Sequence, residues 1–401
     1  MTKKNWNRRE FIVSSALTAS AVTVPRFAWA RAPGEGRLVV IILRGALDGL
    51  AAVPPYGDPH YANARGVLAL DKPGTTGGVL RLDATFGLHP ALGFLHECYH
   101  AQQLTVVHAV STAYRERSHF DGQDVLENGL RRPHEINSGW LNRALDSLSG
   151  AATRDAGIAL GNNVPLMMRG PARVAAWSPS RLSDVDDDTL QRLADLYADD
   201  PVLSRRLADA LANDAIATDA SADRERVGKR EQLAATLQAA AKFLVRREGP
   251  RVAVLETRGW DTHANQGADS GQLAQRLRVL DAALREFRFA LQEVWEHTAV
   301  LLVTEFGRTV AVNGTRGTDH GTGAAAFLAG GAVRGGRTIA DWPGLGPKAL
   351  YQGRDLTPTL DLRAVLKGVL AEQLGVSANV LEREVFTDSR PVAPLRDLIR
   401  V

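Results

Sequence analysis

Short, continuous runs of apolar residues recur along the chain and predict buried strands. The first run, Leu38–Leu43, is rich in β-branched residues and ends at Arg44-Gly45. Comparable runs lie at 104–110, 251–255, 299–303 and 324–328. Runs without polar alternation are typical of strands that are covered on both faces. We therefore expect these five segments to be interior strands of one sheet.

Between these runs, Leu, Ala and Val recur at three- and four-residue steps among charged residues, which is the pattern of amphipathic helices. The clearest helical segments are Leu190–Leu211, Glu225–Arg246 and Gln272–Glu296. Strands that alternate with helices predict an α/β fold with a mostly parallel central sheet flanked by helices. The range of about 159–248 has few strand signals, so we expect a helical insertion there, within one α/β domain spanning 31–401.

The first thirty residues have the layout of an export signal. Arg8 and Arg9 precede an apolar stretch, Phe11–Val24, and Ala28-Trp29-Ala30 supplies a small-x-small cleavage site. Paired arginines before an apolar pair indicate the twin-arginine (Tat) route, with its translocon as a transient partner. We therefore predict a signal peptide over residues 1–30 and a periplasmic or secreted mature protein. The competing interpretation is an ordinary N-terminal helix.

The charge balance argues against some classes of partner. The whole chain has a net charge of +3, but the predicted signal carries five basic residues and one acidic residue, so the remainder has a net charge of −1. A near-neutral chain without a lysine-rich tract gives no electrostatic reason to expect nucleic acid as a partner. No later apolar run approaches the roughly 20 residues of a membrane span, so we expect no stable membrane insertion.

Polar side chains gather where the predicted strands end, and ligands of open α/β sheets bind at those ends. The ends contribute four carboxylates and three imidazoles, namely Asp48, Asp261, Glu305, Asp319, His119, His263 and His320. Oxygen and nitrogen donors of this kind suit zinc or another borderline divalent metal. Asp261 and His263 alternate on an extended segment and so point the same way.

Each of these residues also has an ordinary interpretation. An Asp at a strand end is often an N-cap or turn residue, and Asp-x-His can be a local hydrogen bond. His89, His96, His100 and His108 lie in or beside apolar segments and are expected to be ordinary core or surface histidines. Three arginines near the strand ends suit either salt bridges and carbonyl capping or a bidentate grip on an oxyanion: Arg44, Arg115 and Arg308.

Five ordered segments resemble the hallmark segments of a bacterial family known as domain of unknown function 1501. They are Leu43–Leu50, Arg117–Gln123, Gly259–His263, Thr304–Thr309 and Asp319–Gly321. That family is grouped with the alkaline phosphatase-like (sulfatase-like) superfamily, so the resemblance implies a mostly parallel sheet with a metal site at the strand ends. It also implies metal-ligand roles, which would fall on Asp48, Asp261, His263, Glu305 and His320.

Two departures from the superfamily pattern bear on activity. Superfamily phosphatases have Asp-His where this chain has Glu305-Phe306, so one imidazole ligand is missing. Their nucleophile begins a helix after the second strand, where Ser118 is the nearest hydroxyl here, with Thr112 behind it. Ser118 is equally placed to be only an N-cap. The expected catalytic group is Ser118, His119 and Arg308.

These patterns lead to one main functional hypothesis and one alternative. The first is an exported metal-dependent hydrolase of phosphate or sulfate esters, with zinc, manganese or calcium as the divalent ion and a small or polymeric anionic ester as substrate. The alternative is a non-catalytic, phosphatase-like binding or assembly protein that retains a structural metal site. A purely structural protein without metal would make the polar strand ends coincidental.

Overall fold

The structure is a computed structural model that describes residues 35–149, 156–178, 192–218 except 195 and 198, and 229–400. The signal peptide predicted at residues 1–30 lies outside the described residues. Within the described ranges, no helix combines the length and apolar character that a membrane crossing requires.

A nine-stranded mixed sheet forms the centre of the molecule. Its strands follow the spatial order β10-β4-β9-β8-β1-β7-β5-β6, and β11 pairs with β4. Among the described strands of this sheet, only β9 runs antiparallel to its neighbours. The bounds are β1 (Arg37–Arg44), β4 (Leu104–Ser111), β5 (Gly157–Leu160), β6 (Val174–Trp177), β7 (Val252–Arg258), β8 (Thr298–Val303), β9 (Ala324–Ala329), β10 (Arg337–Ile339) and β11 (Leu360–Asp361). The short strands β2 (Leu80–Arg81) and β3 (Gly87–Leu88) form a separate hairpin. The mostly parallel sheet predicted from the apolar runs is confirmed.

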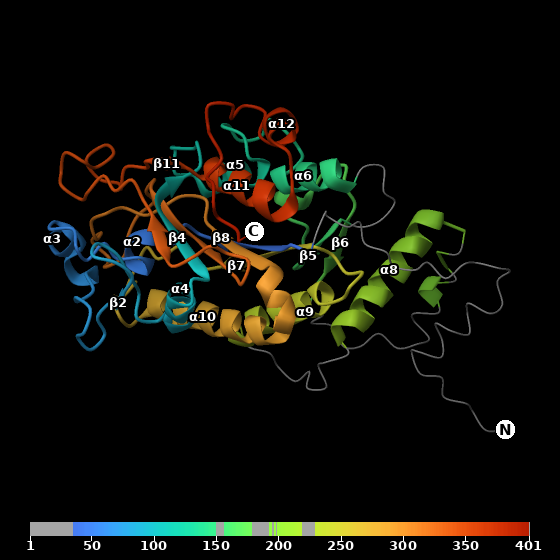
Figure 1. The fold of residues 1–401 in the computed structure, drawn as a ribbon, viewed down its shortest axis with the longest axis horizontal. Coiled ribbons are helices and arrows are strands. Elements are labelled where there is room, and N and C mark those ends of the chain that lie inside the picture. The colour runs from blue at the N-terminus through green and yellow to red at the C-terminus, as the bar shows by residue number, and fades with distance from the viewer. Residues whose placement is uncertain are drawn as a thin grey trace, which may run out of the picture.

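The helices lie in two layers, one on each face of the sheet (Figure 1). One layer holds α4 (Gly93–His100), α9 (Lys229–Leu244) and α10 (Gln272–Leu291). The other holds α5 (His119–Asn128), α6 (Trp140–Ser149) and α11 (Leu362–Leu374). The described residues also form shorter helical elements: α2 (Gly49–Ala52), α3 (Tyr61–Arg65), α12 (Ala378–Val380), η1 (Gly66–Leu68), η2 (Leu166–Met168), η3 (Gln292–His297) and η4 (Leu381–Val385).

Strand β1 lies in the interior of the sheet and explains why its sequence is uniformly apolar. Val39 and Ile41 pack toward α9 and α10, whereas Leu38 and Val40 pack toward α6 and α11. Successive side chains of a strand point to opposite faces, so a strand covered on both faces needs apolar residues at every position. All six residues of the predicted run, Leu38–Leu43, are fully buried.

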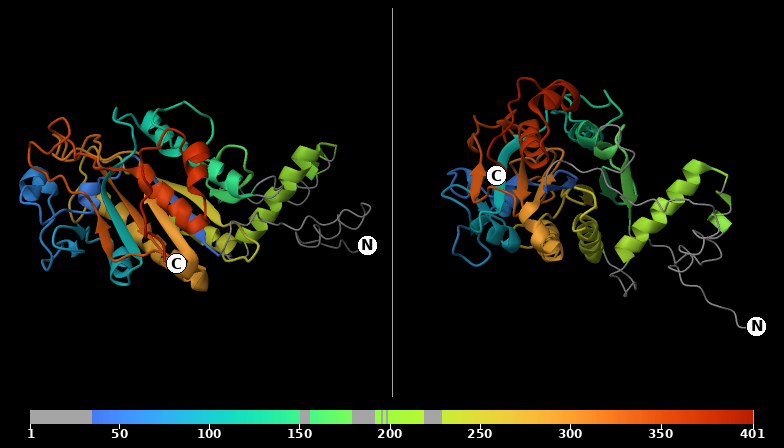
Figure 2. Two further views of the ribbon diagram at one scale, coloured as in Figure 1. Left: turned by 45° about the horizontal axis from the view of Figure 1, so that its top comes forward. Right: turned by 45° about the vertical axis from the view of Figure 1, so that its right-hand side comes forward.

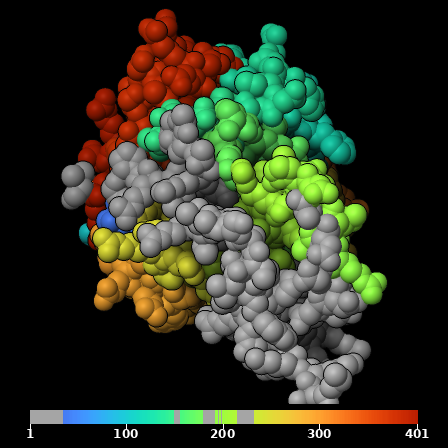
Figure 3. Space-filling model, turned by 90° about the vertical axis from the view of Figure 1, so that its right-hand side faces the viewer, coloured from blue at the N-terminus to red at the C-terminus, as the bar shows by residue number. Residues whose placement is uncertain are grey.

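The middle of the chain differs from its prediction. The range of about 159–248 was expected to be a helical insertion, yet it contains β6 and half of β5, which extend the sheet beyond β7. Each strand has only four residues, too few for a run that stands out in the sequence. The helical part of the expectation agrees with α9 and with α8 (Pro201–Thr218), which projects from the body near the β6 edge (Figure 2) and lies on the face turned to the viewer in Figure 3.

His108 lies in the middle of β4 and is fully buried, as expected of a core histidine. Its Nε2 donates to the Val53 carbonyl at 3.0 Å, and its Nδ1 accepts from the Ala109 amide at 2.7 Å. Its ring stacks on Phe86 with 5.3 Å between the ring centroids. Burial lowers the pKa of His108 to about 4 because a charged imidazolium would lose its hydration there. The folded protein therefore holds this imidazole neutral.

We predict that this burial makes stability depend on pH. The pKa of His108 is lower in the folded protein than in the unfolded chain, so as the pH falls the unfolded chain binds a proton first. The stability that the neutral imidazole contributes is therefore complete above about pH 6.5 and is lost as the pH falls toward 4. Between pH 7 and 4.5 the wild type should lose about 2.5 kcal/mol more of its free energy of unfolding than His108→Gln does. Urea unfolding across this range measures the difference. The exposed-site control His297→Gln should keep the wild-type pH profile; identical profiles for His108→Gln and wild type would contradict the prediction.

Candidate metal centre

A cluster of side chains forms beyond the carboxyl ends of three strands of the sheet, β4, β7 and β8. His119 begins α5 after β4, Asp261 and His263 follow β7, and His320 lies in the connection between β8 and β9. The parallel strands bring these segments, up to about two hundred residues apart in sequence, to one edge of the sheet. Ligand atoms of His119, Asp261 and His320 all lie within 4.8 Å of one another.

The three histidines share one hydrogen-bonding arrangement at Nδ1. His119 Nδ1 lies 2.8 Å from Glu305 Oε1, and His263 Nδ1 lies 3.1 Å from Asp319 Oδ1. His320 Nδ1 lies 2.9 Å from the carbonyl oxygen of Arg117. A carboxylate or carbonyl oxygen only accepts, so each Nδ1 carries a proton, and Nε2 is the unprotonated nitrogen of each ring in its neutral form.

The three Nε2 atoms converge on the carboxylate of Asp261. The separations to its oxygens are 3.4 Å from His119, 3.0 Å from His263 and 3.3 Å from His320. The Nε2 atoms of His263 and His320 are 3.0 Å apart. Lone pairs that face one another and a carboxylate repel unless a proton or a cation lies among them.

The donor set fits a zinc-type ion. Zinc–nitrogen bonds of about 2.0–2.1 Å place neighbouring tetrahedral ligands about 3.3 Å apart. The observed separations of 3.0–3.4 Å are close to this value, with His119 next to Oδ2 of Asp261 and with His263 and His320 next to Oδ1. Among the described residues, His119 Nε2 is buried and has no hydrogen-bond partner. A buried nitrogen without a partner is costly, and a metal ion would satisfy it. The side chains of His119, Asp261, His263 and His320 are 23–44 % exposed, so solvent reaches the centre.

Arg308 holds Asp261 in its ionised state. Its side chain is fully buried, donates through Nη1 to Asp261 Oδ1, and is fixed by bonds from Nε and Nη2 to the hydroxyl and carbonyl of Thr318. Burial alone would raise the pKa of Asp261, but the hydrogen bond and charge of Arg308, with His263 and His119 nearby, bring the pKa below its usual value. Arg308 is thus a partner of the carboxylate, and its position differs from the expected catalytic role of gripping an ester.

Glu305 stands behind His119 instead of joining the converging set. Its carboxylate is fully buried; Oε1 accepts from the amide of Gly45, from Gln123 and from His119, and Oε2 accepts from Thr304. Burial would raise the pKa of Glu305, and these hydrogen bonds hold the pKa below its usual value. The expectation that Glu305 is a metal ligand is corrected to one that it orients His119, as carboxylates commonly do behind metal-binding histidines.

Asp48 and Asp319 also have roles that differ from the expected ligation. The Asp48 carboxylate caps α2, pairs with the buried Arg65 guanidinium, and accepts from Gln266 at 2.7 Å. Its oxygens are thereby committed to a structural ion pair, which corrects the ligand role implied for it. Asp319 lies behind His263 and accepts from Asn313 at 3.0 Å and from His263 Nδ1.

The remaining predicted residues lie at the border of the centre. Ser118 is the N-cap residue of α5, and within the described residues its hydroxyl makes no capping bond to the helix. Thr112 is buried behind the centre, with its hydroxyl 3.5 Å from the Glu305 carbonyl. Arg44 is paired with Glu127 and Glu256, and Arg115 donates to the Thr112 and Tyr114 carbonyls. For these two arginines the salt-bridge and carbonyl-capping interpretations hold.

The two less exposed histidines of the centre have opposite protonation tendencies. The Glu305 hydrogen bond raises the pKa of His119, since the carboxylate favours the charged ring. Burial lowers the pKa of His320, and the nearby charge of His119 lowers it further. His119 therefore takes up a proton more readily than His320 does.

Sequence reasoning missed the residues that hold these side chains in place. Gln123, Gln266 and Asn313 are ordinary polar residues without a spacing that marks them, although Gln123 lies one helical turn after His119. The Arg117 carbonyl is aimed at His320 by a left-handed backbone, with φ of 64°, which is uncommon outside glycine. No side-chain pattern announces such a backbone contact.

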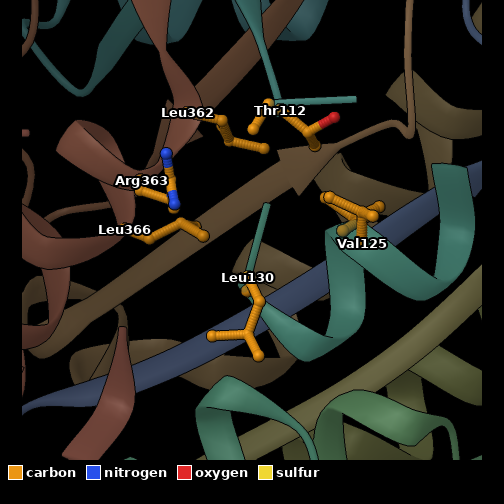
Figure 4. Close-up of a pocket in the computed structure, with 9 residues that line it drawn as sticks. Thr112, Val125, Leu130, Leu362, Arg363 and Leu366 are labelled. Atoms are coloured by element: carbon orange, nitrogen blue, oxygen red, sulfur yellow. The ribbon is translucent and has the colours of Figure 1, made fainter. Parts of the chain in front are cut away.

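A separate cavity lies between α5 and α11 (Figure 4). It is small and is lined mainly by apolar residues such as Val125, Leu130 and Leu366. Arg363, the charged member of its lining, is held by Asp361 and Asp388. The cavity therefore lacks a free charge for an anionic ester among the described residues.

Comparisons with known proteins place the chain as follows. Among solved structures it is similar to the lipoteichoic acid synthase LtaP from Listeria monocytogenes, with 8% identity, 94% of this chain and 80% of that chain covered, and a TM-score of 0.41. It is also similar to the phosphonate monoester hydrolase of Agrobacterium radiobacter, with 10% identity, coverage of 85% and 74%, and a TM-score of 0.40. A third similar structure is an alkaline phosphatase superfamily protein from Vibrio parahaemolyticus, with 12% identity, coverage of 85% and 72%, and a TM-score of 0.37.

A sequence comparison with curated proteins finds no match. The family profile described as "Protein of unknown function (DUF1501)" matches residues 35–385, which include every residue of the candidate centre. The chain therefore belongs to the DUF1501 family.

Proposed function

We propose that this protein is an exported, metal-dependent hydrolase of phosphate or sulfate esters. The observation that carries the proposal is the convergence of three unprotonated Nε2 atoms, from His119, His263 and His320, on the Asp261 carboxylate. These four residues would hold one divalent ion. Nitrogen-rich donors favour zinc over manganese or calcium, which prefer more oxygen ligands.

A metal bound at this centre would polarise an ester oxygen and stabilise the negative charge that develops on it. The chain's own residues prepare the place for it. Glu305, Asp319 and the Arg117 carbonyl fix which nitrogen of each ring is free, while Arg308 keeps Asp261 ionised. Ser118, directly before His119, supplies the candidate attacking hydroxyl, and its hydroxyl is not used to cap the helix within the described residues.

The ester class and the location rest on sequence. The five ordered segments resemble those of an alkaline phosphatase-like family, whose members act on anionic esters. The paired arginines Arg8 and Arg9 with the cleavage site at Ala28–Ala30 support export to the periplasm or beyond by the twin-arginine route. That route carries folded proteins, which suits a centre assembled from distant segments.

One observation favours a second candidate, a binding or assembly protein with a structural metal. Three imidazoles and one carboxylate are four protein donors, and four donors close a tetrahedral shell. Catalytic zinc sites usually keep three protein ligands and one open position. Asp261 is partly exposed and is also bonded to Arg308, so its carboxylate can leave the metal and open one coordination position for substrate. The hydrolase therefore remains the leading proposal.

We predict that the mature protein binds about one equivalent of zinc at this centre. Asp261→Asn and His320→Gln should each remove that equivalent, because the first removes the negative charge of the carboxylate donor and the second removes an imidazole donor. Glu305→Gln should retain the site but weaken zinc affinity by about 10–100-fold, the usual effect of losing a carboxylate behind a metal-binding histidine. Competition with a chromophoric chelator measures the affinities. His297→Gln, an exposed histidine outside the cluster, is the matched control. Wild-type zinc affinity in both Asp261→Asn and His320→Gln would sink the proposed centre.

We predict hydrolysis of an aryl phosphate or an aryl sulfate by the zinc-loaded wild type. Asp261→Asn should lower kcat/KM by about 10³-fold or more, because it removes charge stabilisation at the reacting ester. Ser118→Ala should lower kcat by about 10²–10⁴-fold while metal content stays constant, whereas Thr112→Ser should retain activity. A wild type that holds zinc and hydrolyses neither ester would exclude this hydrolase activity and favour the binding protein.

We predict that export depends on the paired arginines. In the full chain, Arg8→Lys combined with Arg9→Lys should leave the precursor in the cytoplasm, whereas Lys3→Arg combined with Lys4→Arg should be exported normally. Both double variants keep the charge of the segment, so the comparison isolates the arginine pair. Cell fractionation and detection of the shortened mature chain give the readout. Normal export of the Arg8/Arg9 variant would contradict the twin-arginine assignment.

A further inference from the structure

Helix α4 carries a second pair of converging imidazoles, His96 and His100, outside the centre described above. They lie one helical turn apart on the surface, and their Nε2 atoms are 3.1 Å from each other. The ring centroids are 4.4 Å apart and the ring planes are nearly perpendicular, at 88°. Residues at i and i+4 of a helix occupy the same face, so the helix itself sets this geometry.

A third electron-rich atom joins the pair. The carbonyl oxygen of Arg81, at the end of β2, lies 2.9 Å from His96 Nε2. If His96 Nε2 carries the proton, that proton can be donated to the carbonyl oxygen or to His100 Nε2, but not fully to both. If His100 Nε2 carries the proton instead, the lone pair of His96 Nε2 faces the carbonyl oxygen, and the two repel each other. A single cation among the three atoms satisfies all of them together.

The sequence of this turn, His96-Glu97-Cys98-Tyr99-His100, has the spacing H-E-x-x-H. On a helix, that spacing places two histidines on one face for zinc and offers the glutamate as a general base. Here Arg285 of α10 holds the Glu97 carboxylate through two bonds, at 2.8 and 2.9 Å. The two metal donors are therefore in place, while the carboxylate is engaged in an ion pair on α10.

The pair lies at the opposite edge of the sheet from the candidate metal centre. His100 ends α4 only four residues before β4 begins at Leu104, so it lies near the amino end of that strand. The residues of the centre follow the carboxyl ends of the strands. The two groups share no residue, and each can be altered without changing the other.

We propose that His96 Nε2, His100 Nε2 and the Arg81 carbonyl form a surface site for a borderline divalent transition-metal ion. Two imidazoles suit copper, nickel and zinc, and affinity at nitrogen donors is greatest for copper in this series. Two nitrogens and one carbonyl leave further positions open to water. With Glu97 held by Arg285, the site binds a metal and has no hydrolytic role.

The test is a Cu²⁺ titration of the mature protein by calorimetry, with electron paramagnetic resonance of the bound copper. Wild type should bind one Cu²⁺ equivalent at the α4 site. His96→Gln and His100→Gln should each lower the affinity for this equivalent by about tenfold or more, because one of the two imidazole donors is lost. Hyperfine coupling to two equivalent imidazole nitrogens should disappear in both variants. His297→Gln, the matched exposed control, should behave as wild type.

Two further variants separate this site from the proposed centre. Glu97→Gln should keep the copper equivalent, because the carboxylate is not a donor. Asp261→Asn should remove only the equivalent that belongs to the centre and should leave the two-nitrogen signal of the α4 site. Undiminished copper binding in both His96→Gln and His100→Gln would overturn the proposal, whatever the outcome at Asp261. Unchanged circular dichroism spectra show that these surface variants are folded.

Discussion

The convergence of His119, His263 and His320 on the Asp261 carboxylate is the constraint around which the strand ends are arranged. Three imidazole nitrogens within 3.0–3.4 Å of one carboxylate are unfavourable together, when all three are unprotonated, without a proton or a cation among them. Each ring is nevertheless fixed in this orientation by an acceptor behind its Nδ1. The surrounding structure therefore holds the lone pairs in place before any ion arrives, as a preorganised metal site requires.

A buried chain of hydrogen bonds ties this centre to the core. Asp48 can only accept, so the Gln266 amide nitrogen faces it and the Gln266 carbonyl faces the Thr318 hydroxyl at 2.9 Å. The Thr318 hydroxyl then accepts from Arg308, which donates to Asp261. The negative charge of Asp48 thus sets the direction of every bond in the chain. Asp48, which has the sequence position of a metal ligand, instead anchors Arg308 through this chain, and Arg308 orients the candidate ligand Asp261.

The sequence predicted long buried strands more reliably than short ones. Long apolar runs such as Leu38–Leu43 marked the interior strands because two-sided burial requires apolar residues at each position. The four-residue strands β5 and β6 gave no comparable run and were placed within a helical insertion. In the candidate centre, the structure brings together Asp261, His263 and His320 with His119. The pair His96 and His100 appeared ordinary until the structure placed the Arg81 carbonyl beside it.

The sequence by itself determined the α/β class, the alternation of strands and helices, and the set of polar residues at the strand ends, because periodicity and strand ends are local properties. Only the tertiary structure decided the role of each carboxylate. Asp48, Glu305 and Asp261 are all acids that follow strands, yet they become an ion-pair anchor, a histidine-orienting group and the point of convergence. The difference arises from the partners that distant segments bring to each side chain, and a linear sequence does not specify those distances.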